Sequence, residues 1–81
     1  MENYLEYISI NPEIRFGKPS IKGTRIAISD ILKWLASGMS IEEILSDYPA
    51  LQKQHIYAAL NYAAQREEFT KILNEHYETV T

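Results

Sequence analysis

Apolar residues recur at the 3.6-residue period of an amphipathic helix from residue 28 onward. The first run predicts a helix that buries Ile28, Ile31, Leu32 and Leu35 on one face. Ser29 is expected to cap the start of this helix, because a serine hydroxyl can accept a free N–H group of the first turn. Gly38 is expected to end it in the left-handed conformation, which glycine adopts without steric cost.

A second, short helix is predicted from Ile41 to Asp47. Ser40 and Glu43 have the spacing of a capping box, in which each side chain accepts the backbone N–H of the other residue. Pro49 is expected to end this helix, since Tyr48 before a proline is pushed out of the α region.

A third helix is predicted to begin near Gln52 or Lys53 and to run to about Gln65. Its inward stripe is expected to contain Ile56, Ala59, Leu60 and Ala63. A further helical stretch follows over residues 67–81. No proline or glycine marks a joint between the two, so the sequence leaves open whether they form one helix.

The first 28 residues follow a different pattern, with short β-prone runs between turn-forming residues. The runs are Tyr7 to Ile10, Ile14 to Phe16, and Thr24 to Ile28. The turn formers are Pro12, Gly17, Pro19 and Gly23, and Gly23 is expected to adopt a positive φ. We therefore expect a strand or two here and not a full sheet.

These elements predict one domain, because 81 residues can build only one modest core. Residues 1–28 would form an extended arm, residues 29–66 a helix-turn-helix core and residues 67–81 a helical tail. The predicted fold class is mainly α. It is a tri-helical helix-turn-helix of the homeodomain-like or winged-helix-like kind, with a short N-terminal β-strand or hairpin and a C-terminal helix.

Charge is distributed unevenly, although the net charge of −3 argues against general nucleic-acid binding. The stretch from residue 15 to residue 25 contains no acid and four basic residues, which are Arg15, Lys18, Lys22 and Arg25. From residue 67 onward there are four acids and one basic residue, Lys71. The basic stretch could contact phosphates, or both stretches could simply be solvated surface.

In a helix-turn-helix, the first turn of the third helix points into the major groove of DNA. The polar residues expected there are Gln52, Lys53, Gln54, His55, Tyr57 and Asn61. Glutamine can pair with adenine, and lysine can reach guanine or a phosphate. The alternative is that these residues are merely exposed, since three-helix packing is common in proteins that never bind DNA.

Several function classes receive no support. Cysteine is absent, so neither disulfides nor thiolate metal sites can form, which fits a reducing cytosol. His55 and His76 are far apart in the chain and are both expected to be exposed, so no metal site is predicted. No cofactor motif or nucleophile–base arrangement indicates an enzyme. No apolar run is long enough to span a membrane, and the acidic start of the chain is unlike a signal peptide, so we expect a cytoplasmic protein.

The chain resembles the bacterial domain-of-unknown-function 433 family over about residues 7 to 69. The resemblance rests on Gly17-x-Pro19-x-Ile21-x-Gly23-Thr24-Arg25, Leu35-Ala36-x-Gly38-x-Ser40-x-Glu42-Glu43-Ile44, Tyr48-Pro49-x-Leu51 and Ile56-x-Ala58-Ala59-Leu60. Members look like helix-turn-helix antitoxins, often encoded beside a toxin with a PIN-like nuclease fold. The resemblance implies a protein that represses its own operon and neutralises that toxin.

The chain departs from this family at the start of the third helix. The family usually has Thr or Ser at position 52 followed by acids, whereas this chain has Gln52-Lys53-Gln54-His55. The change removes a good N-cap, which is typically worth about 1 kcal/mol. It also makes the helix start more favourable for DNA, although drift on an exposed surface explains it equally well.

A protein partner is expected at the acidic end of the chain. Phe69, Ile72, Leu73 and Tyr77 form an amphipathic stretch that could lie in a groove of a toxin, and the surrounding acids would suit a basic nuclease cleft. A homodimer is also expected, because the core is small and operator half-sites usually match two-fold symmetry. Trp34 is expected either in the core or at such a contact. The competing hypothesis is a protein-interaction module of the same fold that does not bind DNA.

Overall fold

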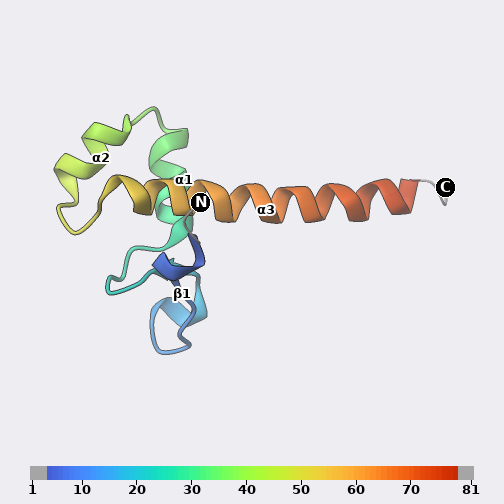
Figure 1. Cartoon of the computed structure of the whole chain (residues 1–81), viewed down its shortest axis with the longest axis horizontal. Coiled ribbons are helices and arrows are strands. Elements are labelled where there is room, and N and C mark those ends of the chain that lie inside the picture. Colours follow the sequence, from blue (N-terminus) through green and yellow to red (C-terminus); the bar gives the residue numbers. More distant parts are fainter. Residues whose placement is uncertain (1–3, 79–81) are drawn as a thin grey trace.

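The computed structural model describes residues 4–78, with side chains described as far as residue 66. Two 3₁₀ helices and two short strands precede three α-helices (Figure 1). In chain order they are η1 (Tyr4–Tyr7), β1 (Ile8–Ser9), η2 (Arg15–Gly17), β2 (Ser20–Ile21), α1 (Ile28–Ala36), α2 (Ile41–Asp47) and α3 (Lys53–Glu78). The predicted mainly helical fold with a small N-terminal β element is therefore confirmed.

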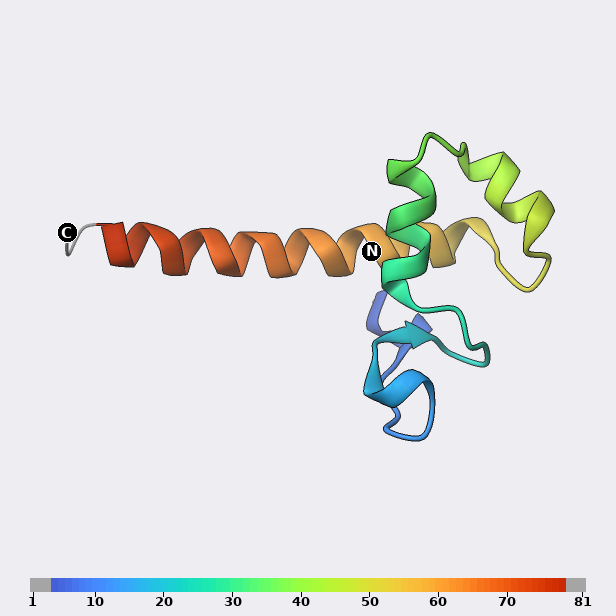
Figure 2. The same cartoon turned by 180° about the vertical axis from the view of Figure 1, so that it is seen from behind.

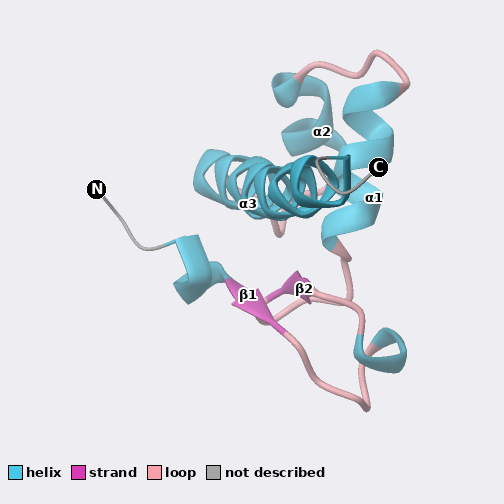
Figure 3. Cartoon of the chain, turned by 90° about the vertical axis from the view of Figure 1, so that its right-hand side faces the viewer, coloured by secondary structure: helices cyan, strands magenta, loops and turns pink. Residues whose placement is uncertain are grey.

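The two strands form a small antiparallel sheet, in which Ile8 is opposite Ile21 and Ser9 is opposite Ser20. Ser20 also forms an isolated bridge with Ala27, just before α1. Viewed along α3, this sheet lies below the long helix, α2 lies above it and α1 lies alongside (Figure 3). The sheet thus ties the N-terminal arm to the start of α1.

The strand predictions in the arm were only partly correct. The run Tyr7 to Ile10 contains β1, but Ile14 to Phe16 forms no strand, since Arg15 and Phe16 have left-handed φ values of 51° and 58°. The run Thr24 to Ile28 is a loop that leads into α1, and the second strand lies earlier, at Ser20–Ile21. Side-chain propensity was a poor guide here because distant pairing with β1 decides which residues form a strand.

The expected cap of α1 was also wrong. Ser29 lies within the helix, and Ala27 occupies the N-cap position. The carboxylate of Asp30 accepts the backbone N–H of Ala27 at 3.0 Å. The N–H of Ile28 donates to the carbonyl of Pro19 at 2.9 Å. The first turn of α1 therefore receives its hydrogen-bond partners from Asp30 and from the arm, without a hydroxyl cap.

The predicted signals around α2 are confirmed. Gly38 has a φ of 102° after the end of α1. The Ser40 N–H donates to a Glu43 carboxylate oxygen at 3.0 Å, and the Glu43 N–H donates to the Ser40 hydroxyl at 3.1 Å. Tyr48, before the proline, leaves the helical region with φ −127° and ψ 81°. Local sequence alone determines the bounds of this helix.

The core lies where the arm and the three helices meet. Its largest fully buried side chains are Ile21, Ile31, Ile44 and Ile56. The prediction that Leu60 faces inward was wrong, because its side chain is 42% exposed whereas Ala58 is buried. The reason is that α3 packs against η1 as well as against α1 and α2. Ala58 lies one turn after His55, whose ring contacts Tyr7 of η1.

Helix α3 is a single continuous helix and not two segments, which answers the question that the sequence left open. Its distal half projects away from the rest of the molecule in two opposite views (Figures 1 and 2). The predicted partner-binding residues Phe69, Ile72, Leu73 and Tyr77, and also His76, lie in this half, outside the residues whose side chains are described. Within the described chain, no helix is long and apolar enough to cross a membrane.

Candidate nucleic-acid interface

The first turn of α3 leaves two of the predicted DNA-contacting side chains in solvent. Gln52 occupies the position just before the helix, and both it and Lys53 are exposed. Gln54 is half-buried, and its side-chain amide donates to Oε1 of Gln52 at 2.6 Å. This bond holds the two glutamine side chains together beside Lys53, at the end of a helix whose free N–H groups favour phosphate.

His55 has a structural role that differs from the predicted one. Its Nδ1 atom accepts the backbone N–H of Gln52 at 2.9 Å. Its ring meets the ring of Tyr7 edge-on, with centroids 5.5 Å apart and an interplanar angle of 86°. The expectation that His55 is exposed was wrong, since it is half-buried. Burial lowers the pKa of His55 below its ordinary value, which favours the neutral ring that Nδ1 needs as an acceptor.

The bond between Gln52 and His55 also bears on the N-cap that α3 lacks. A histidine three residues into the helix supplies the reciprocal half of a capping box, as glutamate does in α2. His55 thus offsets part of the departure from the family pattern at Gln52, because it satisfies the N–H of Gln52 but not an N–H of the first turn.

Tyr57 and Asn61 lie further along α3. The Tyr57 side chain is 49% exposed. The Asn61 amide donates to the backbone carbonyl of Tyr57 at 3.0 Å and is half-buried. Asn61 would have to give up this bond to reach a base, whereas Tyr57 is already accessible.

The loop between β2 and α1 presents two of the four basic residues. Thr24 closes this loop, because its hydroxyl donates to the carbonyl of Ile21 at 2.8 Å and accepts the N–H of Ile26 at 3.0 Å. Gly23 turns the chain with a φ of 83°. Lys22 and Arg25 are exposed on either side of this turn.

The Arg15 side chain forms hydrogen bonds within the folded chain. Its Nη1 atom donates to the Asp30 carboxylate at 2.9 Å and to the carbonyl of Arg25 at 3.0 Å. Burial raises the pKa of Asp30, but the hydrogen bonds from Arg15 and from the Ala27 N–H outweigh it, so this pKa lies below its ordinary value. Arg15 therefore links the arm, the loop and α1 and is poorly placed to contact phosphate.

The structure brings part of the predicted set to one side of the molecule. The loop between β2 and α1 and the turn between α2 and α3 project from the same side, opposite to the direction in which α3 extends (Figures 1 and 2). The loop contains the exposed residues Lys22 and Arg25, and the turn leads into the exposed residues Gln52 and Lys53. Lys18 does not join them, because it lines a pocket between the arm, α1 and α3.

The sequence did not predict the contact that sets the turn. The rings of Trp34 and Tyr48 are stacked, with centroids 4.1 Å apart and an interplanar angle of 13°. Leu51, also in the turn, is buried. The stack fixes the end of α2 against α1, and the turn places the start of α3. A tyrosine directly before Pro49 and a tryptophan late in α1 were the only sequence indications of it.

Acidic residues on α2 limit how DNA could approach. Glu42, Glu43 and Asp47 are all exposed on this helix. The hydrogen bond from the Ser40 backbone N–H, together with its hydroxyl, lowers the pKa of Glu43. Phosphates would be repelled from α2, so any duplex would have to be held by α3 and the loop.

The family model described as protein of unknown function (DUF433) matches residues 8–63, which is more than half of the chain. The chain belongs to the DUF433 family. The family signature residues Gly23 and Thr24 form the loop described above, and Pro19 supplies the carbonyl that receives the first N–H of α1. These three residues of this DUF433 protein thus help to fold the arm onto α1.

Two relatives support this membership. The uncharacterized protein y4eO of Sinorhizobium fredii is 34% identical over 58 residues, which are 72% of this chain and 26% of that protein. The crystal structure of a DUF433 member from Anabaena variabilis is similar with a TM-score of 0.72 and 31% identity, covering 76% of this chain and 61% of that chain. This DUF433 chain thus spans about a quarter of the first relative and less than two thirds of the second.

Proposed function

We propose that this DUF433 protein is a DNA-binding antitoxin of the cytoplasm that represses its own operon and neutralises a PIN-like nuclease toxin. It would act by binding and not as an enzyme. The observation that supports DNA binding most directly is the exposed start of α3, with Gln52 and Lys53. The turn before it projects from the same side as the loop that contains Lys22 and Arg25. A helix start would enter the major groove, and the loop would contact the flanking phosphates.

These residues would have different roles in DNA binding. Gln52 can contact a base edge, because it is exposed and its side chain is oriented by Gln54. Lys53 can reach either guanine or phosphate. Lys22 and Arg25 would supply affinity that depends on salt but not on sequence. Duplex DNA from the protein's own upstream region is the substrate to test.

Fluorescence anisotropy with that DNA and with a scrambled duplex tests the proposal. Binding is expected to strengthen as salt falls and to favour the upstream sequence. Lys53→Ala is expected to weaken binding at least about fivefold, as for loss of one base or phosphate contact. Lys71→Ala is the matched control, since it lies on the same helix about 27 Å further along. Equal binding by both variants, or no binding at low salt, would contradict the proposal.

The proposed toxin contact is the distal half of α3, beside which no other described part of the chain lies (Figures 1 and 2). Co-expression with a neighbouring nuclease-like reading frame tests this part. Truncation after Glu68 is expected to abolish co-purification while leaving the helical content of residues 4–66 intact. Unchanged co-purification of the truncated chain would refute the assignment.

A second candidate function is a protein-interaction module that does not bind DNA. The exposed acids of α2 favour it, because they lie next to the proposed DNA side. The exposed apolar side chains of Leu5, Tyr57 and Leu60 also suit a protein contact. Failure to bind any duplex together with retained co-purification of a partner would select this alternative.

A further inference from the structure

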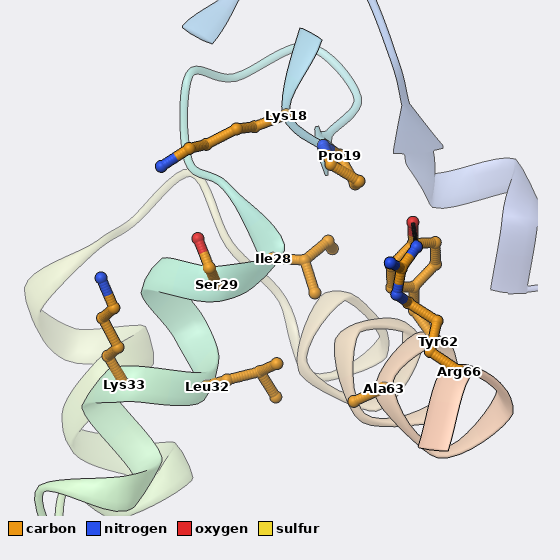
Figure 4. Close-up of a pocket in the computed structure, with 9 residues that line it drawn as sticks. All are labelled: Lys18, Pro19, Ile28, Ser29, Leu32, Lys33, Tyr62, Ala63 and Arg66. Carbon is orange, nitrogen blue, oxygen red and sulfur yellow. Dashed lines mark hydrogen bonds between the residues drawn. The ribbon is translucent and has the colours of Figure 1, made fainter. Parts of the chain in front are cut away.

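A pocket with a volume of about 490 Å³ lies between the arm, α1 and the middle of α3. Apolar groups of Pro19, Ile28, Leu32 and Ala63 line it. In Figure 4, Ile28 and Leu32 point from α1 across the gap toward α3. Its size is in the range of clefts that take up several apolar groups at once. Apolar side chains of a helix could therefore be buried here.

The rim of this pocket is basic. Lys18 and Lys33 lie with Ser29 at one rim, and Arg66 lies with Tyr62 at the other (Figure 4). Arg66 donates to the Tyr62 hydroxyl at 3.0 Å, and its guanidinium lies 5.4 Å from the centre of that ring. The described residues that line the pocket include no acid. An occupant that is apolar on one face and acidic around it would match both properties.

The distal half of α3 has this composition. Its apolar residues Phe69, Ile72 and Leu73 have the i, i+3, i+4 spacing of one helix face. Its acidic residues are Glu67, Glu68, Glu75 and Glu78, against the one basic residue Lys71. No other described part of the chain packs against this stretch (Figures 1 and 2), although most helix stability in proteins comes from the packing of an amphipathic face. A surface that covers its apolar face would therefore stabilise it.

The pocket and this stretch cannot meet within one chain. Tyr62, Ala63 and Arg66 of α3 line the pocket, and the helix continues without a break directly after them. The distal half is thus directed away from the pocket that its own helix helps to form (Figure 1). A second copy of the chain has no such restriction, and two copies can exchange these halves about a two-fold axis.

We propose that the pocket binds the distal half of α3 from a second copy, and that the exchange is reciprocal, giving a two-fold dimer. The inference deepens the proposed function, because it names the first protein partner of distal α3 and the surface that receives it. A toxin would then contact the part of distal α3 that the partner's pocket leaves exposed. Each dimer would contain two contacts in which Lys18 and Lys33 face the acids of the partner helix.

Charge reversal tests the proposal with the full-length protein. One variant combines Lys18→Glu with Lys33→Glu at the pocket, and another combines Glu75→Lys with Glu78→Lys on distal α3. By sedimentation equilibrium at low salt, each variant alone is expected to dimerise at least about tenfold more weakly than the unmodified chain. An equal mixture of the two is expected to recover an affinity within about threefold of the original, because both contacts of the mixed dimer again join opposite charges.

The matched control reverses Lys22 and Lys53 to glutamate, which lie outside the pocket, and it is expected to dimerise normally. A monomeric unmodified chain would overturn the proposal, as would equal dimerisation of all variants or a mixture that fails to recover. A monomer that still binds its DNA would overturn this inference alone. A dimer with the expected variant behaviour but no DNA binding would overturn only the proposed function.

Discussion

Nδ1 of His55 accepts the backbone N–H of Gln52 at 2.9 Å, and the His55 ring packs against the ring of Tyr7 in a T-shaped arrangement. One side chain therefore caps α3 and attaches it to the N-terminal arm. The cap requires an unprotonated Nδ1, and burial lowers the pKa of His55, so the neutral ring is favoured. The start of α3, where the proposed DNA contacts lie, thus depends on the protonation state of this histidine.

Stability is expected to fall as the pH drops below about 6.5, the ordinary pKa of histidine. Because the pKa of His55 is lower in the folded chain than in the unfolded chain, the unfolded chain binds the proton first. The contribution of His55 is therefore fully present above about 6.5 and is lost as the pH falls through the folded pKa. Urea denaturation between about pH 8 and 5 measures this loss.

The variant His55→Gln serves as the control for this pH effect, since glutamine can accept the same N–H without titrating in that range. It retains His76, so only the contribution of His55 is removed. A stability profile of the variant that falls as steeply as that of the unmodified chain would show that another group is responsible.

Asp30→Ala is expected to destabilise the chain more than Arg15→Ala. The aspartate accepts both the Arg15 side chain and the Ala27 N–H, whereas the arginine change leaves the second bond in place. The ion pair is partly solvated, so Arg15→Ala should cost under about 1 kcal/mol and Asp30→Ala about 1–2 kcal/mol. Urea denaturation gives both values, and Asp47→Ala, at an exposed position, should be nearly neutral. Equal costs for Arg15 and Asp30 would contradict the role assigned to the Ala27 bond.

Ile56→Ala and Leu60→Ala, one turn apart on α3, are expected to differ strongly. Ile56 is fully buried, so the cavity left by truncation should cost about 2–5 kcal/mol. Leu60 is 42% exposed, so its truncation should cost under about 1 kcal/mol. Thermal or urea unfolding measures both. A large cost at Leu60 would mean that another surface covers it in solution, as a dimer or partner would.

Tyr48→Ala is expected to lower stability by about 2 kcal/mol and to shift the emission of Trp34 to the red, because the stacked ring that shields the indole is removed. Trp34 is the only tryptophan of the chain, so its fluorescence reports on this site alone. Tyr48→Phe keeps the ring and should leave both quantities nearly unchanged, as should Tyr57→Phe. An unchanged emission in Tyr48→Ala would show that the stack does not persist in solution.

The helix-turn-helix part was predictable because its boundaries are set by neighbours in the sequence. The Ser40 and Glu43 pair starts α2 and the Tyr48-Pro49 step ends it, and the observed bounds match those predicted. Both interactions act over three residues or fewer. No distant part of the chain is needed to set the bounds of this helix, although the Trp34–Tyr48 stack fixes its end against α1.

The arm and the start of α1 were not predictable in the same way. The first N–H of α1 finds its acceptor at Pro19, and β2 is placed by its pairing with Ile8 and Ser9. Arg15 has a left-handed φ, and its side chain is bonded to groups on Asp30 and Arg25. Such contacts between distant residues override local propensity, and they also remove Arg15 from the predicted phosphate contacts.

The candidate interface also combines features that local sequence predicts with features that depend on contacts between distant residues. Charge and polarity correctly marked Gln52, Lys53, Lys22 and Arg25 as exposed positions. They could not show that His55 is engaged by Tyr7, because that contact joins residues almost fifty positions apart. A list of polar residues thus overestimates an interface wherever the fold uses some of them internally.

Because α3 is unbroken, the distance of its distal half from the core and the rotation of that half about the helix axis are coupled. Each residue added to an α-helix turns one end against the other by about 100°. Inserting two residues after Arg66 would therefore rotate everything beyond that point by more than half a turn, while seven residues would nearly restore the original orientation. The number of residues in this 26-residue helix therefore sets the angular position of distal α3 relative to the core, and not only its distance from it.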